Sequence, residues 1–413
     1  MSARHVIADL RELAARTSTA EGAQRLAWGP VWHDAREWFK GKIAEIGLRV
    51  ETDPAGNSWS TLAGASPKTV ILGSHLDSVP NGGWLDGALG VLAGLEALRT
   101  HAGTTPPVTL KLVDWADEEG ARFGRSLLGS SAAAGSLRID EVRNLEDRQG
   151  TRLVDALAGH GVSLDRMLDA HRALKAFDAR AYLELHIEQG PVLESLKKPA
   201  GVVIGTFGVE RHMIRFTGQA AHSGSTPIPM RRDAFLAAAE TALECRAIGL
   251  RHSKPGAGVV CTVGVVNVEP KIVTAVPGVC EISLDQRALD ATVLAAMHRD
   301  ARAASERSAR ENNVGVEWKH LWRIEPRPFD ATLVQLCEDA VREETGDAPR
   351  LPSGPLHDAA EMVPHMPVVM MFACSSNGLS HCREEDTPEL QLEQTIRAYL
   401  RLVGKVVAHV AAA

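Results

Sequence analysis

Two apolar segments separated by a helical pattern restrict most strongly how this chain can fold. Residues 69–74 and 108–115 are rich in β-branched and other apolar side chains, as in strands buried inside a sheet. Residues 87–99 between them have the pattern of a helix. Strands that alternate with helices form a sheet covered by helices. The sequence therefore predicts an α/β fold around a central sheet.

Other segments extend this pattern to both ends of the chain. We expect helices at residues 2–16, 32–46 and 390–411, strands at 49–52, 58–62 and 181–187, and helical structure across 136–175.

Residues 211–322 have a different character. Their pattern predicts the β-α-β-β-α-β order of a split βαβ unit, with strands at 211–217, 258–268, 280–285 and 314–322 and helices at 233–250 and 291–312. A chain of 413 residues exceeds the usual size of one core, so two domains are expected. We predict a first domain formed by residues 1–208 and 326–413, interrupted by an inserted domain at 209–325.

Composition excludes several kinds of partner. The net charge of −7 and the absence of Lys/Arg clusters argue against nucleic acid or an anionic membrane. The first 16 residues lack the apolar core of a signal peptide, and the longest apolar run, 368–374, is too short to span a bilayer. Six cysteines without a CxxC pair indicate reduced thiols. We expect a cytoplasmic protein.

Metal-ligating residue types follow the two apolar strands. His75 ends the first strand, Glu118 and Glu119 follow the second, and Asp86 lies in a glycine-rich loop before a helix. Ligands bind at the carboxyl ends of strands in such sheets, and imidazole with carboxylate suits Zn²⁺ or Mn²⁺. A lone histidine at a strand end is usually a core residue, but three such positions together favour a metal site. The extra glutamate can accept a proton from a metal-activated water.

The chain resembles the metal-dependent amidohydrolases grouped with the M20 peptidases. It is most similar to the N-carbamoyl-L-amino-acid hydrolase and allantoate amidohydrolase (hydantoinase/carbamoylase) branch. The resemblance implies a zinc-peptidase-like catalytic domain with a central mixed sheet, and an inserted ferredoxin-like (βαββαβ) domain that forms a homodimer. The motifs that carry it lie at residues 73–87, 117–123, 184–191, 221–227, 230–234 and 378–381.

The resemblance also implies two divalent ions per subunit: Zn²⁺, or Mn²⁺, Co²⁺ or Ni²⁺. His75 and Glu119 would bind separate ions, and Asp86 would bridge them. His186 and His381 would complete the two sites. His186 distinguishes branches of the family, because peptidases and aminoacylases usually have Asp or Glu at this position.

Three residues are assigned to catalysis by the same resemblance. Glu118 would be the general base, and the family pattern alone separates its role from that of Glu119. Asp77 would orient the imidazole of His75 as a hydrogen-bond acceptor. His222 would donate to the developing oxyanion from the neighbouring subunit.

Substrate-binding roles are implied for residues in both domains. Arg287 would bind the substrate carboxylate with its planar fork, and Gln189 would contact the ureido or carboxylate end. Thr274 stands where the family usually has an asparagine that contacts substrate. A structural ion pair is expected for Arg231 and Arg232.

The loop at residues 353–359 retains Gly354 and His357 of a family substrate-binding motif. Pro355 stiffens this loop and Leu356 adds bulk where the family has glycine. Both changes bear on the substrate and leave the metal chemistry intact.

The resulting prediction is hydrolysis of an N-carbamoyl-L-amino acid to the amino acid, CO₂ and ammonia. Allantoate or a related ureido acid is the second substrate class. An N-acyl amino acid or dipeptide is disfavoured by His186. A non-catalytic metal-binding protein is disfavoured by Glu118, since such a protein has no need of a general base.

Overall fold

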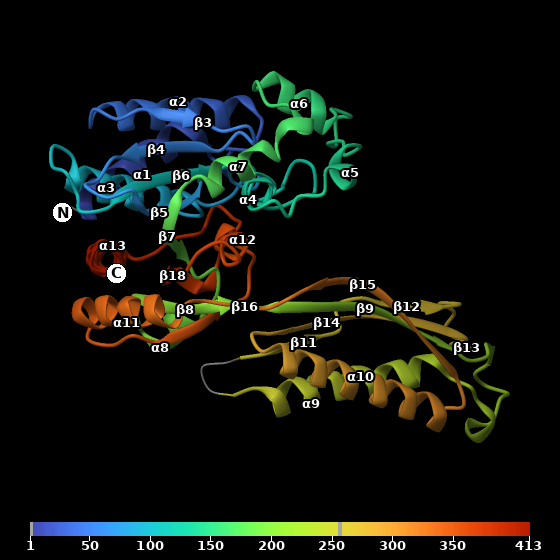
Figure 1. The fold of residues 1–413 in the computed structure, drawn as a ribbon. Coiled ribbons are helices and arrows are strands. Elements are labelled where there is room, and N and C mark those ends of the chain that lie inside the picture. Colours follow the sequence, from blue (N-terminus) through green and yellow to red (C-terminus); the bar gives the residue numbers. More distant parts are fainter. Residues whose placement is uncertain (1–2, 255–257) are drawn as a thin grey trace. The chain divides into compact units, whose positions relative to one another are not determined.

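The computed structural model describes residues 3–254 and 258–413. The chain divides into two compact units (Figure 1). The first comprises Met1–Ile204 and Phe329–Ala413, and the second comprises Gly205–Pro328. In the described part of the chain, no helix is both long and apolar enough to cross a membrane.

A mixed nine-stranded sheet forms the centre of the first unit, in the order β16-β8-β18-β7-β5-β6-β4-β3, with β17 also paired to β8. Its strands are β3 (Val50–Thr52), β4 (Ser58–Leu62), β5 (Lys68–His75), β6 (Thr109–Trp115), β7 (Asp178–Ile187), β8 (Ala200–Thr206), β16 (Arg327–Pro328), β17 (Arg350–Ser353) and β18 (Val368–Ala373). The adjacent strands β18, β7, β5 and β6 run parallel. Their carboxyl ends therefore lie along one edge of the sheet.

Helices bury the apolar strands of this sheet. The long ones are α1 (Ala3–Thr17), α2 (Pro30–Ala44), α3 (Ala88–His101), α11 (Ala331–Thr345) and α13 (Glu389–Ala412). Helix α3 is buried on nearly every side and contacts β5, β6 and β7. Such a helix must lie inside the core, and this places the loop before it at the carboxyl edge of the sheet.

The predicted helical segment 136–175 is broken into short helices. These are α5 (Ile139–Val142), α6 (Leu153–Gly159), the 3₁₀ turn η1 (Leu164–Arg166) and α7 (Asp169–Lys175). Gly161, with φ of 75°, follows the end of α6 as glycine often does at a helix terminus, and Gly150, with φ of 81°, lies in the turn between α5 and α6. Two elements that the sequence pattern did not predict, α4 (Leu128–Ala134) and α8 (Val192–Leu196), are also short, as is α12 (Asp358–Met362).

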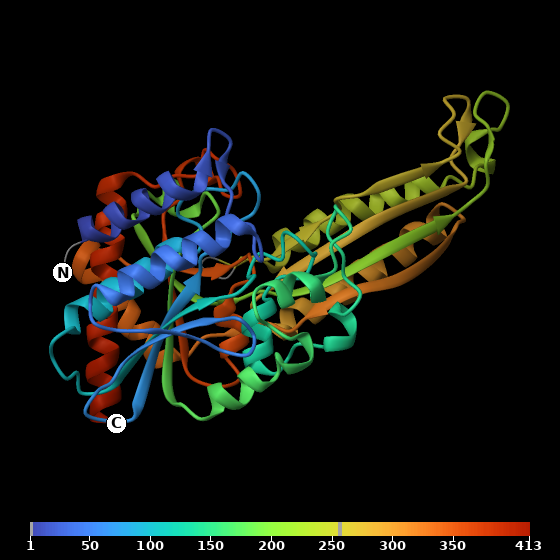
Figure 2. The ribbon, with the colours of Figure 1, turned by 90° about the horizontal axis from the view of Figure 1, so that it is seen from above.

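The second unit contains an antiparallel sheet of order β11-β14-β9-β15, with β12 also paired to β14. Figures 1 and 2 show two long helices along this sheet, and both contact β9 and β14. The elements are β9 (Gly208–Thr217), α9 (Ala234–His252), β11 (Val260–Thr262), β12 (Val266–Glu269), β14 (Val279–Ala288), α10 (Ala291–Glu311) and β15 (Gly315–Ile324).

The single strand predicted at 258–268 is wrong, since β11 and β12 are separate strands. The hydroxyl of Ser283 on β14 accepts hydrogen bonds from the N–H groups of Gly264 (3.2 Å) and Val265 (2.9 Å). A side chain thus replaces the backbone partner at this point, and the ladder is interrupted.

A small two-stranded antiparallel sheet, called here the strand pair, lies beyond one end of the long strands. It pairs β10 (Ala221–His222) with β13 (Ala275–Val276), and Figure 1 labels β13 at this end. Strand β14 pairs with β9 along its whole length, from Val279 opposite Thr217 to Ala288 opposite Gly208. Arg287, the residue before Ala288, and the strand pair are therefore at opposite ends of β14.

Candidate metal centre

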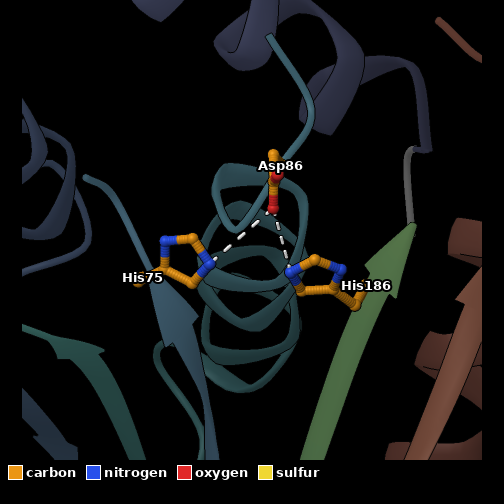
Figure 3. A group of neighbouring side chains, drawn as sticks. All are labelled: His75, Asp86 and His186. Carbon is orange, nitrogen blue, oxygen red and sulfur yellow. Dashed lines mark ion pairs between the residues drawn. The ribbon is translucent and has the colours of Figure 1, made fainter. Parts of the chain in front are cut away.

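The candidate centre lies at the carboxyl edge of the parallel strands in the first unit. His75 is the last residue of β5, and His186 is the penultimate residue of β7. Their ring centroids are 5.8 Å apart. Figure 3 shows both rings pointing toward Asp86, which reaches them from the loop before α3.

Asp86 is shared by two groups of metal-ligating residues. Its Oδ1 lies 3.1 Å from Nε2 of His186 and 3.8 Å from Nε2 of His75. Its Oδ2 lies 3.3 Å from Nε2 of His381, which is also 3.4 Å from Oε2 of Glu119. The two groups, His75–Asp86–His186 and Asp86–Glu119–His381, have the donor atoms that Zn²⁺ and related ions select. A carboxylate that faces both groups can bridge two ions.

The buried histidines are oriented for metal binding. Nδ1 of His75 lies 3.1 Å from the carbonyl oxygen of Asp77, and Nδ1 of His186 lies 3.0 Å from the carbonyl oxygen of Ile187. A carbonyl oxygen only accepts hydrogen bonds, so each Nδ1 carries the proton. On His75 the lone pair is then on Nε2, the atom that faces Asp86. On His186 burial would lower the pKa of the ring, but the hydrogen bond of Nε2 to Asp86 raises it to about 9, and this Nε2 proton would leave when an ion binds.

The carboxylate of Asp77 contacts the main chain of the two glutamates. Its Oδ1 and Oδ2 accept hydrogen bonds from the N–H groups of Glu118 and Glu119, each at 3.2 Å. The same carboxylate is 3.7 Å from Nδ1 of His75, farther than the Asp77 carbonyl. Asp77 was predicted to orient His75 through its carboxylate, whereas its closer contact with that ring is through the main chain.

A left-handed residue turns the chain after β6. Asp117 has φ of 58°, and its side chain accepts a hydrogen bond of 2.7 Å from Nε1 of Trp28. This turn lets consecutive glutamates face one cluster, although adjacent residues of a straight strand face opposite sides. Glu118 Oε2 lies 3.7 Å from Nε2 of His75, and Glu119 contacts His381 as given above.

Buried negative charge dominates the electrostatics of the centre. Burial raises the pKa of Glu118 well above its usual range, and nearby carboxylates raise it further. Burial and the charge of Asp86 raise the pKa of Glu119 in the same way. Burial would also raise the pKa of Asp86, but hydrogen bonds from His186 and His381 hold it well below its usual range. Divalent cations would neutralise this excess charge.

Burial lowers the pKa of His75 to about 4. Its ring is therefore neutral at pH 7, as a metal ligand must be. Together with the Nε2 atoms that face Asp86, this neutral ring makes the donor set fit two divalent ions.

Gln189 and His357 lie beside the predicted ligands. Nε2 of Gln189 is 3.1 Å from Oδ2 of Asp86 and 3.1 Å from Nε2 of His381. The ring of His357 is buried with its centroid 4.4 Å from that of His186. Gly354 belongs to the same loop as His357 and is partly exposed.

The centre is buried except on one side. The side chain of His381 is 48% exposed, whereas those of His75, Asp86 and Glu119 are at most 6% exposed. The cluster is therefore exposed to solvent at His381.

Two buried charged residues at this centre were not predicted from the sequence. Oε1 of Glu385 accepts hydrogen bonds from the N–H groups of Leu85 (3.1 Å) and Asp86 (3.0 Å). Arg25 is fully buried and donates from Nε to the carbonyl oxygen of Leu76 at 2.7 Å. In the sequence, neither residue follows a predicted strand end or lies in a glycine-rich loop. The sequence therefore gives no signal that separates Arg25 or Glu385 from charged residues on the surface.

The remaining predicted substrate residues, His222, Thr274 and Arg287, belong to the second unit. His222 pairs with Ala275 in the strand pair, and the N–H of Ser223 donates to the carbonyl oxygen of Thr274 at 2.8 Å. His222 and Thr274 are therefore neighbours. Nε of Arg287 donates to Oδ1 of Asp285 at 2.8 Å, at the other end of β14.

Arg231 and Arg232 have structural contacts, but with carbonyl groups and not with the carboxylates predicted for an ion pair. Arg231 donates to the carbonyl oxygens of Thr226 (3.0 Å) and Ser223 (2.7 Å). Arg232 donates to the carbonyl oxygen of Asn313 at 2.9 Å. These arginines hold the loop after β10 in place.

The fold and the cluster are those of an α/β metal-dependent hydrolase. Comparison with known proteins agrees, since residues 71–405 match the model of Peptidase family M20/M25/M40. The chain is similar to an N-carbamoyl-L-amino acid amidohydrolase of Geobacillus stearothermophilus, with 36% identity over 88% of each chain. It is also similar to an allantoate amidohydrolase of Escherichia coli, with 35% identity over 92% of this chain and 91% of the other.

Solved structures give the same result. An amidase of the hydantoinase/carbamoylase family from Burkholderia multivorans superimposes with a TM-score of 0.88 and 31% identity, over 98% of this chain and 97% of the other. The chain belongs to Peptidase family M20/M25/M40. Within it, the protein is an amidohydrolase, a hydrolase that acts on amide C–N bonds.

Proposed function

We propose that this protein is a two-metal amidohydrolase that cleaves the carbamoyl C–N bond of an N-carbamoyl-L-amino acid. The products are the amino acid, CO₂ and ammonia, with one water consumed. The observation that carries this proposal is the position of Asp86 between two ligand groups, one of which contains His186. The similarity to an N-carbamoyl-L-amino acid amidohydrolase supports the same substrate class.

His75 and His186 would hold one ion, Glu119 and His381 would hold the other, and Asp86 would bridge them. When bound, such ions polarise the substrate carbonyl and make the attacking water more acidic. Zn²⁺, Mn²⁺, Co²⁺ and Ni²⁺ all suit imidazole and carboxylate donors.

Glu118 moves the proton in this mechanism. Its carboxylate accepts a proton from the attacking water and then donates it to the leaving nitrogen. The raised pKa of Glu118 favours a group that must hold the proton between these two steps. Asp77 keeps Glu118 in position through its hydrogen bond to the main chain.

The substrate would be held by residues of both units. Gln189, His357 and Gly354 would line the substrate position beside the ions. Arg287 would bind the α-carboxylate and would have to share its guanidinium with Asp285. His222 would donate to the oxyanion, next to Thr274.

The positions of His222 and Arg287 support a homodimer. The nine residues from Val279 to Arg287 on β14 extend over about 26 Å, and the strand pair with His222 lies beyond Val279. One copy of the second unit cannot bring both residues to a small amino acid derivative. We propose that the two residues at each site come from different subunits.

Allantoate is the second candidate substrate. The specific observation in its favour is the 35% identity to an allantoate amidohydrolase. The changes at Thr274, Pro355 and Leu356 lie in the segments that would contact substrate, so they bear on this choice.

A substrate panel tests the proposal. The full-length protein is freed of metal by chelation and reloaded with Zn²⁺, Mn²⁺, Co²⁺ or Ni²⁺. It is then assayed with N-carbamoyl-L-amino acids, allantoate, N-acyl amino acids and a dipeptide. We expect ammonia release from N-carbamoyl-L-amino acids, only after reloading. Faster turnover of allantoate would favour the second candidate, and activity in verified metal-free protein would contradict the mechanism.

A further inference from the structure

The second unit contains a group of histidines and a glutamate between its sheet and α10. Glu210 and His212 occupy alternate positions of β9 and are buried. They precede Ile214 and Phe216, which have the same alternation and belong to the core of this unit. His298 lies on α10, which contacts β9. Polar side chains thus continue the face of the strand that apolar residues occupy farther along.

The distances within this group suit a metal ion. Nε2 of His212 lies 3.0 Å from Oε1 of Glu210, and the ring centroids of His212 and His298 are 4.6 Å apart. The three residues can each supply one ligand atom with all three atoms within 4.8 Å of one another. Ligands of a tetrahedral zinc ion lie about 3.4 Å apart, so small side-chain movements would complete the contacts.

Buried polar atoms in the group have no partner. Nδ1 of His212 and Nδ1 of His298 are both inaccessible to solvent and make no hydrogen bond within the described residues. Oε1 of Gln286, opposite Glu210 on β14, is in the same situation. Buried polar atoms nearly always have a partner. Burial also lowers the pKa of His212 and His298, so both rings are neutral and have a free lone pair at pH 7.

A hydrogen-bonded His–Glu pair is the alternative interpretation. Nη1 of Arg323 lies 3.6 Å from Oε2 of Glu210 and balances part of its charge. This interpretation accounts for the contact between Glu210 and His212. It gives no role to the ring of His298, whose buried Nδ1 has no hydrogen-bond partner within the described residues and which can supply one of the three ligand atoms.

We propose that Glu210, His212 and His298 form a divalent-metal site of the zinc type in the second unit. It shares no residue with the cluster around Asp86. His320 on β15, whose Nε2 lies 3.9 Å from Oε1 of Glu210, is within reach of the fourth position. The ion would connect α10 to β9 and β15, so its role is structural.

Metal counting on the full-length protein tests this site. Chelated protein is reloaded with Zn²⁺, excess ion is removed, and bound zinc is measured by mass spectrometry. We expect His212→Leu and His298→Leu each to lose one zinc per chain, or to bind it at least about tenfold more weakly. His252→Leu is the matched control, because Nε2 of His252 contacts Asp300 at 3.0 Å in the same unit outside the group. Equal zinc content in the wild-type protein and all three variants would overturn the proposal.

A second measurement applies even if these variants fold poorly. Asp86→Ala removes the shared carboxylate of the other cluster and leaves the second unit intact. In chelated Asp86→Ala protein, adding Zn²⁺ should slow amide hydrogen exchange in β9 and α10. Unchanged exchange in both elements at saturating Zn²⁺ would also overturn the proposal.

Discussion

Asp86 is held in place by neighbours on several sides. His186 and His381 contact its two carboxylate oxygens, and Gln189 donates to Oδ2. Its main-chain N–H donates to Glu385, whose other oxygen accepts from the hydroxyl of Ser380 at 2.9 Å. A ligand restrained in this way has lost its conformational freedom before a metal ion arrives, which favours tight binding.

Glu118→Gln should separate proton transfer from metal binding. The amide cannot accept a proton, so kcat should fall by about 10²–10⁴-fold while the metal content stays unchanged. Glu119→Gln should lower the metal content as well as the activity. Metal analysis beside kinetics measures both quantities, and the reverse pattern would exchange the roles of the two glutamates.

Glu385→Ala should weaken metal binding without removing any proposed ligand. The N–H groups of Leu85 and Asp86 would lose their acceptor, so the loop would hold Asp86 less firmly. We expect the metal affinity to fall by about 10–100-fold, with activity recovered at high metal concentration. Glu384→Ala is the control, because Glu384 is exposed and bonds to Arg383. Equal losses in the two variants would show that Glu385 has no special role.

At the scale of secondary structure, the ends of strands and the turns that follow them position the residues of the metal centre. Parallel strands β5, β6 and β7 bring three chain segments to one edge. The loop before α3 then returns Asp86 to that edge. Gly87 makes this possible, since it has φ of 65° and a Cβ there would lie 2.4 Å from the ring of His75.

Gly87→Ala should therefore displace the ring of His75 as well as strain the backbone at residue 87. We expect kcat/KM to fall by about 100-fold, the scale of a displacement of about 1 Å at a catalytic centre, with metal lost on dialysis. Gly103→Ala is a matched control, since Gly103 also has a positive φ, 79°, but no atom lies within 4 Å of its Cβ position. That variant should lose about 1–2 kcal/mol of stability and keep its activity per folded molecule.

Elements whose signal is local were predicted well from the sequence. The apolar strands β5 and β6 and the helix α3 between them follow from periodicity, and their strand-end order led to His75, Asp86 and Glu118. The helical prediction for 136–175 holds for four short helical elements, but the turns that separate them were not predicted. The division between β11 and β12 depends on the hydroxyl of Ser283, a contact from a strand that comes later in the chain.

At the scale of the whole molecule, two units contribute different chemistry. The first unit contains every predicted metal ligand, and the second contains His222, Thr274 and Arg287. Their association into one active site would be a property of the proposed homodimer. Sequence pattern alone cannot predict it, because the partner surfaces carry no periodic signal. Glu385 and Arg25 were missed for a related reason, since only tertiary contacts reveal their role.

Mixing inactive subunits should test the proposed homodimer. His222→Ala retains Glu118, and Glu118→Gln retains His222, so a mixed dimer would contain one complete site. Random reassociation of equal amounts should restore about a quarter of wild-type activity. The activity of each variant alone is the control. Verified mixed dimers without recovery would show that His222 acts within its own chain or not at all.

The exposure of His381 makes the two proposed ions unequal in their exchange kinetics. The group with His75 and His186 is buried on all its ligands, so its ion would leave slowly. The group with His381 is open to water at a ligand that is 48% exposed, so its ion would exchange readily with the surrounding solution. In purified protein, the ion at the His75–His186 group would thus be the one bound when the protein was made. The ion at the His381 group would be the one present in the most recent buffer.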